Sequence, residues 1–345
     1  MSSKNNKKDQ IFEIRKVQVT GGSTFLISLP KKWVNKIKLS QGDQVAIFES
    51  EIYEGSLVID PKYSDTDRTK KTSIEIKTDE GFDLSREIIA AYLFGYDLIE
   101  IKSDQNISPD QREEIKNTTQ RLIGIEIVEE SSKIIRVQCL ISPIALPLEK
   151  TIDRIFIIVS QMLKDAIYAI IHGDTKLADN VVDRDEEVNR LYFLSVRQLR
   201  SSIQDANIAR LSDITPLQCL DYRVIAKAIE SAGDFIVEII RIYKDEIAVQ
   251  KEDIPMKIKN KLNDLTQTVY DMMQKAKKVM TSKSMKLAIE VIGHDKEIFK
   301  TKADDLRQII KENPSGWFLP LDSILDLLIK ISDIAGIDIA DLVMS

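Results

Sequence analysis

The side chains best suited to chemistry are carboxylates spaced four residues apart in the second half of the chain. Glu230 and Asp234 occur in the run AIESAGDF, and on a helix this spacing places both on one face. Two unpaired like charges there destabilise a helix by a few tenths of a kcal/mol, and a bound cation would remove that repulsion. Asp185 and Asn189 show the same spacing within a largely apolar pattern. Such oxygen ligands suit a hard cation.

A second interpretation of these carboxylates remains open, in which they cap helices and cover solvated helix faces. A catalytic carboxylate-bridged metal centre in a helical bundle typically carries Glu-x-x-His pairs on inward helix faces, and this chain has none. Neither of its two histidines, His172 and His294, is followed four residues later by a residue that commonly ligates metals. We expect both on helix surfaces, and we expect no enzymatic activity.

The second group of chemically suited residues is basic and lies at the front of the chain. Residues 1–48 contain nine Lys or Arg and three Asp or Glu, a net charge of +6, whereas the whole chain carries −6. The remainder therefore carries −12. This asymmetry predicts a basic front that meets polyanions and an acidic body that does not. The candidate phosphate-contacting residues are Arg15, Lys16, Lys31, Lys32 and Lys36.

The pattern around these basic residues predicts a small β-rich domain. Apolar and polar residues alternate on both sides of Gly21-Gly22, which indicates two strands joined by a turn. Pro30 then introduces a short basic helix, and QVAIF and SLVID indicate two further strands. Four short strands and one helix in about 50 residues make too small a core for one chain. We therefore expect this domain to dimerise.

The residues RKVQVTGGSTFLISLPKKW and LSQGDQVAIF resemble the SpoVT-AbrB swapped-hairpin DNA-binding domain over residues 11–61. In that family two chains interlace their hairpins into one barrel that presents basic residues to DNA. The resemblance implies a homodimer that binds duplex DNA. The alternative, a dimerisation module with a solvated lysine surface, remains open.

The next segments are predicted to be a linker and a connector. The polar, charged residues 62–71 indicate the linker. Residues 72–146 indicate the order β-α-β-α-β-β, a small α+β domain in which Ser108 caps the second helix and Pro109 is its first residue. The segment has no glycine-rich phosphate loop and no catalytic constellation. We therefore expect a connector rather than an effector-binding domain.

From residue 147 onward, helical periodicity dominates and the sequence repeats itself. LADNVVDRDEEVN, beginning at Leu177, returns as LAIEVIGHDKEIF at Leu287, so that Asp185 matches Asp295 110 residues later. Arg197-Gln198-Leu199 likewise returns as Arg307-Gln308-Ile309. A fixed period marks a duplicated structural unit. We predict two units of three long antiparallel helices, at about 147–245 and 252–345.

These duplicated motifs resemble the PhoU family of phosphate-uptake regulators over residues 148–345. IESAGDF is similar to its E-x-x-x-D motif, which binds metal clusters at the bundle surface in relatives. The resemblance implies Glu230, Asp234 and Asp185 as ligands of a divalent or ferric ion (Fe, Mn, Mg, Ca or Zn). The second copy reads IKISDIA, in which Ile329 replaces the glutamate, and this implies a degraded site with Asp333 and Asp295.

The apolar runs and the cysteines of the chain bear on where the protein is found. No apolar run approaches the roughly 18 residues that cross a bilayer, and Cys139 and Cys219 form no paired motif. We expect a cytoplasmic, multidomain protein with a swapped-hairpin β domain, an α+β domain and an all-α body of two three-helix repeats. The predicted function is phosphate-responsive regulation through DNA binding. In the alternative, the body binds a phosphate ABC transporter or its signalling partner and the front only dimerises.

Overall fold

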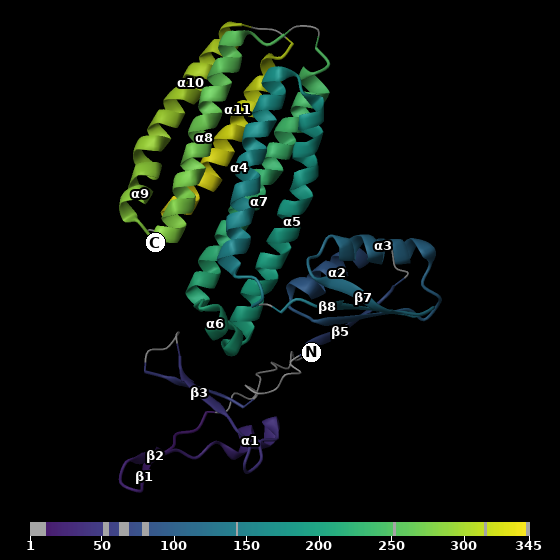
Figure 1. Cartoon of the computed structure of the whole chain (residues 1–345), viewed down its shortest axis with the longest axis vertical. Coiled ribbons are helices and arrows are strands. Elements are labelled where there is room, and N and C mark those ends of the chain that lie inside the picture. The colour runs from purple at the N-terminus through teal and green to yellow at the C-terminus, as the bar shows by residue number, and fades with distance from the viewer. Residues whose placement is uncertain are drawn as a thin grey trace, which may run out of the picture. The chain divides into compact units, whose positions relative to one another are not determined.

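The chain divides into two compact units, an N-terminal unit, Met1–Arg68, and a second unit, Thr69–Ser345. The computed structural model describes residues 12–50, 55–61, 69–77, 83–142, 144–250, 253–313 and 316–342. Most of the predicted linker at 62–71 lies outside these residues. The two units are shown in Figure 1 and are described separately.

The N-terminal unit contains two short hairpins and one helix. Strands β1 (Gln18–Thr20) and β2 (Thr24–Leu26) pair in antiparallel fashion. Between them Gly21 and Gly22 have φ of +60° and +85°, in the left-handed region that glycine adopts without strain. Helix α1 (Lys31–Ile37) follows Pro30, and β3 (Ala46–Glu49) pairs with β4 (Leu57–Asp60). The predicted β-rich domain is confirmed.

The second unit begins with an α+β domain, here called the middle domain. Its elements are β5 (Lys71–Glu75), α2 (Leu84–Leu93), β6 (Leu98–Lys102), α3 (Pro109–Gln120), β7 (Ile125–Glu130) and β8 (Ile134–Cys139). The sheet order is β5-β6-β8-β7, with β5 and β6 parallel and the other pairs antiparallel. Both helices cover the same face of the sheet (Figure 1). Ser108 and Gln111 form a capping box at α3, and Pro109 opens the helix as predicted.

The rest of the second unit is a helical bundle, here called the body. The first repeat consists of α4 (Leu148–His172), α5 (Thr175–Gln204), α6 (Ala206–Ser212), α7 (Pro216–Ile242) and the π-helical turn η1 (Tyr243–Ile247). The second consists of α8 (Met256–Ser282), α9 (Met285–Glu290), η2 (Val291–Asp295), α10 (Lys296–Glu312), α11 (Phe318–Ser332), η3 (Asp333–Asp338) and α12 (Ile339–Leu342). One continuous apolar core includes residues of both repeats, and α4 packs against α8. The multidomain fold class is confirmed.

Two features of the body go beyond the predicted three-helix repeats. The short helix α6 lies between α5 and α7, whereas α10 and α11 are joined directly by a short connection. Asp234 and Asp333 are therefore 99 residues apart, although Asp185 and Asp295 are 110 apart. The π-helical turns η2 and η3 also interrupt the second repeat at Asp295 and Asp333. Such turns occur frequently at functional sites, but periodicity alone does not reveal them.

Helix α4 is long and apolar enough to cross a membrane, with a mean hydropathy of 1.5 over its best window, of which 56% is buried inside the structure. It packs against α5, α7 and α8. Because most of its apolar residues belong to the shared core, α4 has the character of a core helix.

Arg197 on α5 joins the body to the middle domain. Its side chain is only 2% exposed, and its guanidinium donates to the carbonyl oxygens of Tyr92 and Tyr96 at 2.9 and 2.7 Å and to Asp97 Oδ1 at 2.6 Å. The other oxygen of Asp97 accepts from the backbone N–H of Lys70 at 2.9 Å. Asp97 therefore connects the start of β5, the start of β6 and the body.

Candidate DNA interface and candidate metal sites

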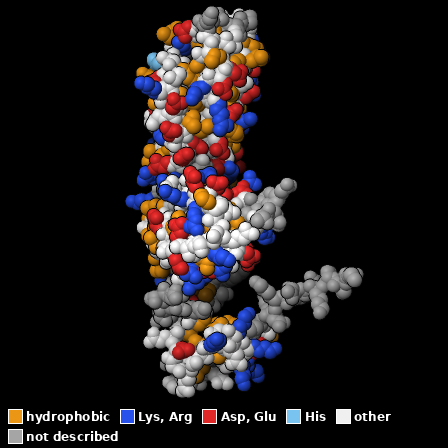
Figure 2. Space-filling model, turned by 90° about the vertical axis from the view of Figure 1, so that its right-hand side faces the viewer, with side chains coloured by type: hydrophobic (Ala, Val, Ile, Leu, Met, Phe, Trp, Pro, Cys, Tyr) orange, Lys and Arg blue, Asp and Glu red, His pale blue; other side chains and the backbone are white. Residues whose placement is uncertain are grey.

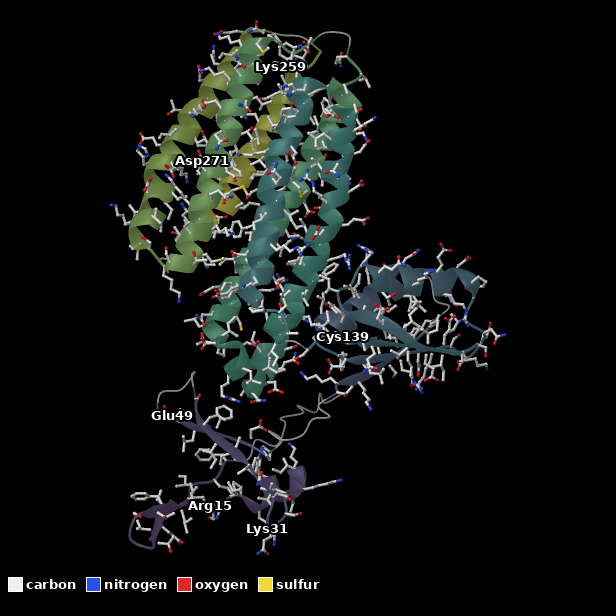
Figure 3. The ribbon with its side chains drawn as sticks, in the orientation of Figure 1. Arg15, Lys31, Glu49, Cys139, Lys259 and Asp271 are labelled. Carbon is white, nitrogen blue, oxygen red and sulfur yellow. The ribbon has the colours of Figure 1, made fainter. Side chains whose placement is uncertain are left out.

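The predicted phosphate-contacting residues all lie on the surface of the N-terminal unit. Arg15 and Lys16 precede β1, Lys31 and Lys32 begin α1, and Lys36 lies in its last turn, all with exposed side chains. Lys32 and Lys36 share one face of α1 because they are four residues apart. Figure 3 shows Arg15 and Lys31.

The ion pairs of these residues differ. Arg15 pairs with Glu13, whereas Lys16, Lys31, Lys32 and Lys36 form no ion pair with any residue in the described part of the chain. Lys38 ends α1 in a left-handed conformation, with φ of 60°. Figure 2 shows Lys and Arg side chains at the surface of the N-terminal unit, with few Asp or Glu side chains on that face. As far as the described residues show, these ammonium groups are unpaired and available to a polyanion.

The N-terminal unit also exposes the apolar residues that would form its core. Among its described residues none is buried. Phe12, Ile14 and Phe25 are 84%, 86% and 73% exposed, and Val19, the cross-strand partner of Phe25, is 59% exposed. Burying one such side chain stabilises a fold by about 1.5–3 kcal/mol. A single copy of this unit therefore lacks the apolar burial that a stable domain requires.

In the first repeat, the structure brings the predicted carboxylates together at the interface of α5 and α7. Glu230 is buried and pairs with the Lys227 ammonium, whereas Asp234 is exposed at the bundle surface. Asp185 on α5 is half-buried. Its burial, followed by the charge of Asp234 and more weakly that of Glu230, raises its pKa from 3.8 to about 6, against a hydrogen bond from Asn189. The charges of Asp234 and Glu230 thus disfavour an ionised Asp185 at this point.

The fit of this cluster to a cation rests on Asp185. Its Oδ2 accepts from the Asn189 amide at 2.9 Å, but Oδ1 is buried without a hydrogen-bond partner in the structure. A Cβ placed on Gly233 would lie 3.2 Å from Oδ1, so glycine permits the close approach of α7 to this oxygen. The donor set suits a hard cation. Among the described residues, however, no three carboxylate, histidine or cysteine side chains converge as a preformed metal cluster.

In the second repeat, Asp295 corresponds to Asp185, and its carboxylate has an ion-pair partner. Asp295 is only 8% exposed, and the Lys275 ammonium donates to its Oδ1 and Oδ2 at 3.0 and 2.8 Å and to Glu290 Oε1 at 2.6 Å. The repeat period aligns Lys275 with Asp165, which pairs with Arg184 at 2.7 Å. An internal ammonium therefore occupies the position next to Asp295, whereas Asp185 has no such partner.

The remaining candidate residues are Asp333, the two histidines and the two cysteines. Asp333 begins η3, and its charge helps to raise the pKa of Asp338, after the larger effect of burial. His172 stacks on Tyr168 with a ring-centroid distance of 3.9 Å, and His294 Nδ1 lies 3.5 Å from Asp295 Oδ1. Cys139 and Cys219 are both free.

Sequence reasoning singled out the carboxylates but missed the residues that set their environment. Gly233 lies within the IESAGDF motif. A glycine directly before the charged Asp234 was the signal in the sequence that could have marked a close approach of two helices. Lys275 could have been found by asking what each repeat carries at the position aligned with Asp165. The partners of Arg197 were not predictable from the duplication, because its counterpart Arg307 instead pairs with Asp322 at 2.9 Å and with Asp326.

Comparison with known families agrees with the two resemblances. Residues 152–243 match the family model described as the PhoU domain, and residues 18–67 match the model described as antidote-toxin recognition MazE, bacterial antitoxin. The chain therefore combines a MazE/AbrB-like N-terminal domain with a PhoU domain. Both are regulatory rather than catalytic families. A search of curated proteins gave no match.

Proposed function

Because the chain carries a MazE/AbrB-like domain followed by a PhoU domain, we propose that it is a homodimeric regulator of phosphate homeostasis that binds duplex DNA. The observation that carries this proposal is the N-terminal unit. Its described lysines form no ion pair with another described residue, and its apolar residues are uncovered in a single copy. The first feature suits a polyanion and the second requires a partner chain.

A second copy of the chain is the partner that the N-terminal unit needs. Its hairpins expose Val19 and Phe25 on neighbouring strands, and interlacing two copies would bury both sets of apolar residues. The same association doubles the basic side chains on one assembly. Each phosphate that they neutralise releases counterions, and this release drives binding to duplex DNA.

The body is the sensing part of this proposal. Asp185, Glu230 and Asp234 would hold a divalent or ferric cation, which would relieve their mutual repulsion and give the buried Asp185 Oδ1 a partner. In the second repeat, Lys275 already neutralises Asp295. We therefore assign cation binding to the first repeat and not to the second.

The DNA-binding part is tested by a paired substitution. Arg15→Ala with Lys16→Ala should abolish retention of duplex DNA at low salt while the dimer remains intact in light scattering. The matched control, Lys116→Ala with Lys257→Ala, removes two exposed lysines of the second unit and should bind as the parent does. Unchanged retention by the Arg15/Lys16 variant would refute this role of the N-terminal surface.

The cation-binding part is tested by elemental analysis of the purified chain. Glu230→Ala with Asp234→Ala should lower the bound metal, whereas Glu238→Ala with Asp245→Ala, which removes two exposed carboxylates, should not. Equal metal content in the Glu230/Asp234 variant and its parent would eliminate the site.

A second candidate function is docking of the body to a phosphate transporter or its signalling partner. Exposed apolar residues on the N-terminal part of α7 favour it, since Leu217, Leu220 and Val224 follow one helix face and are 70%, 61% and 54% exposed. Co-purification of membrane transporter components with the full chain, in the absence of DNA retention, would select this function over DNA binding.

A further inference from the structure

The middle domain contains an open cavity of about 780 Å³, within the size range of small-molecule sites. It lies beyond the ends of β5 and β6, where Glu75 and Lys102 are the last strand residues. The start of α3 and the β7–β8 hairpin also line it. Glu75 and Lys102 mark the carboxyl ends of the parallel pair. In open α/β sheets, ligands bind in the crevice outside the carboxyl ends of the strands.

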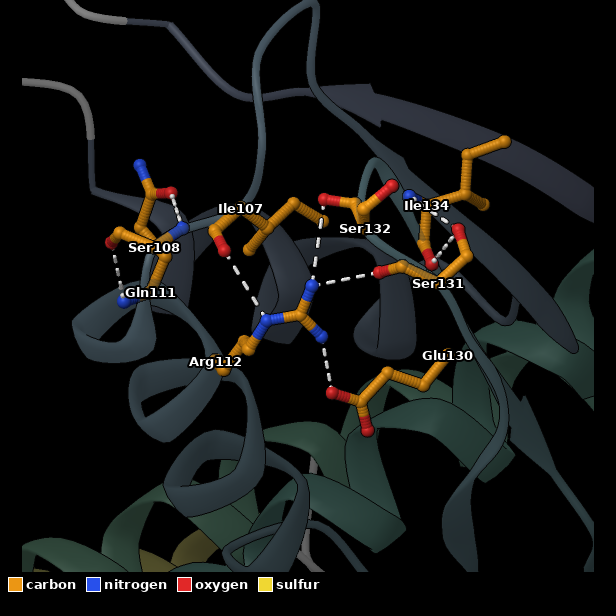
Figure 4. Close-up of polar contacts among 8 residues, drawn as sticks. All are labelled: Ile107, Ser108, Gln111, Arg112, Glu130, Ser131, Ser132 and Ile134. Atoms are coloured by element: carbon orange, nitrogen blue, oxygen red, sulfur yellow. Dashed lines mark hydrogen bonds and ion pairs between the residues drawn. The ribbon is translucent and has the colours of Figure 1, made fainter.

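The walls of the cavity are fixed to each other by hydrogen bonds. Ser103 N–H donates to the Lys133 carbonyl at 3.0 Å, and Ile107 N–H donates to the Ser132 carbonyl at 2.8 Å. Arg112 on α3 donates to the carbonyls of Ile107 and Ser131 at 3.2 and 2.7 Å (Figure 4). Because the loop after β6 and the hairpin are held together before any ligand arrives, binding would lose little conformational entropy.

Three lysines from three separate segments line the cavity: Lys77 after β5, Lys102 at the end of β6 and Lys133 in the hairpin. Lys133 Nζ donates to the Asp104 carbonyl at 2.6 Å, and Lys102 Nζ pairs with Glu100 at 2.6 Å. Lys77 is exposed and forms no hydrogen bond or ion pair with another described residue. Ammonium groups of this kind bind phosphate as point charges.

The other polar groups of the lining decide how an anion would be held. In the capping box at the start of α3, the Gln111 N–H donates to Ser108 Oγ and the Ser108 N–H donates to Gln111 Oε1. Pro109 has no N–H, so the helix end itself contributes little. Glu75 and Asp104 also line the cavity, and as carboxylates they repel any anion that lies close to them. A ligand must therefore gain more from the three ammonium groups than it loses to these two carboxylates, which requires an anion long enough to contact all three lysines.

We propose that this cavity binds a linear chain of two or more phosphates, either inorganic or as the polyphosphate part of a nucleotide. Each phosphate group carries roughly one to two negative charges at neutral pH, which matches a site with three ammonium groups. Among the described residues that line the cavity, none is an aromatic side chain on which a nucleobase could stack. Recognition therefore rests on the phosphates.

The position of the site gives the middle domain a role beyond that of a connector. The same two strands that would hold the ligand at their carboxyl ends are tied at their amino ends to α5, through Lys70, Asp97 and Arg197. A ligand here would bind the element that lies between the N-terminal unit and the body in the chain.

The test is isothermal titration of the full chain, in metal-free buffer, with tripolyphosphate and with ATP. We expect one ligand per chain, bound at least tenfold more weakly by the variant Lys77→Gln with Lys102→Gln. The matched control is Lys71→Gln with Lys116→Gln, which removes the same charge from the opposite end of β5 and from the outer part of α3. It should bind as the parent does.

The two titrants also distinguish the source of the phosphates. Tripolyphosphate binding as tightly as ATP identifies an inorganic chain, and tighter ATP binding identifies a nucleotide; either result supports the site. Three results would overturn it: no heat with either titrant at millimolar concentration, equal loss in the control, or loss only in Lys31→Gln with Lys32→Gln. The last result would place the polyphosphate on the N-terminal unit.

Discussion

The duplication supplies a matched pair of arginines with which to measure how firmly the middle domain is attached to the body. Arg197 and Arg307 occupy the same position of the two repeats. Arg197 is 2% exposed and serves two carbonyls and Asp97, whereas the Arg307 side chain is 28% exposed and pairs with surface aspartates. The same substitution should therefore have very different costs at the two sites.

For Arg197→Ala we expect a loss of about 3–5 kcal/mol in the free energy of unfolding. Removing one partner of a buried ion pair typically costs this much, and the Tyr92 and Tyr96 carbonyls also lose a donor. Arg307→Ala should cost about 1 kcal/mol or less, because exposed ion pairs contribute little. Arg197→Lys keeps the positive charge but loses the planar guanidinium that donates to several acceptors at once. Its loss in the free energy of unfolding should fall between those of Arg197→Ala and Arg307→Ala.

Chemical denaturation of the three variants measures these differences, and hydrogen exchange locates them. The backbone N–H groups of Asp97 and Leu98 donate to the Lys70 carbonyl at 2.7 and 3.1 Å, and in Arg197→Ala they should exchange faster than in the parent. If Arg197→Ala and Arg307→Ala lose the same free energy within about 1 kcal/mol, the attachment inferred from the structure is wrong.

Three further substitutions test other parts of the structure. Asp185→Asn should stabilise the metal-free chain at pH 7.5 by about 1 kcal/mol. The pKa of the native carboxyl is raised to about 6, so the folded chain binds this proton more tightly than the unfolded chain does. Ionised Asp185 therefore lowers the free energy of unfolding, and this loss develops as pH rises from about 4 to about 6. No gain relative to exposed Asp183→Asn in calorimetry would contradict this. Lys275→Met should cost about 1–3 kcal/mol, because it leaves the buried Asp295 carboxylate without its ammonium, with partial rescue by Asp295→Asn. A cost no larger than that of exposed Lys278→Met would exclude the pairing. Phe25→Asp should convert the dimer to monomers in light scattering while Leu319→Asp, also on an exposed apolar residue, does not; an intact Phe25→Asp dimer would place the interface elsewhere.

The elements of this fold were predictable where a local pattern is sufficient to define them. The Gly21-Gly22 turn and the cap formed by Ser108 depend on neighbours in sequence, and both are confirmed. The helices of the body follow from apolar periodicity and from the duplication. Helix α6 escaped prediction because its seven residues are too few to establish a helical period.

The environment of the candidate sites was less predictable, because it depends on contacts between distant segments. The spacing of Glu230 and Asp234 could be seen in the sequence, but the orphaned Oδ1 of Asp185 depends on how closely α5 approaches Gly233. The ammonium that satisfies Asp295 comes from α8, 20 residues earlier. Whether a carboxylate repels its neighbours or is already paired is decided by packing of this kind.

The salt dependence of duplex DNA binding by the unmodified full chain is the decisive experiment for the proposed role of the N-terminal unit. Five basic residues from each of two chains would give a log–log slope of up to about −9, with about 0.9 per phosphate contact. We expect a dimer that retains duplex DNA at low salt, with a plot of log affinity against log salt concentration whose slope approaches this limit. A chain that is monomeric, or whose weak association with DNA is insensitive to salt, would contradict it.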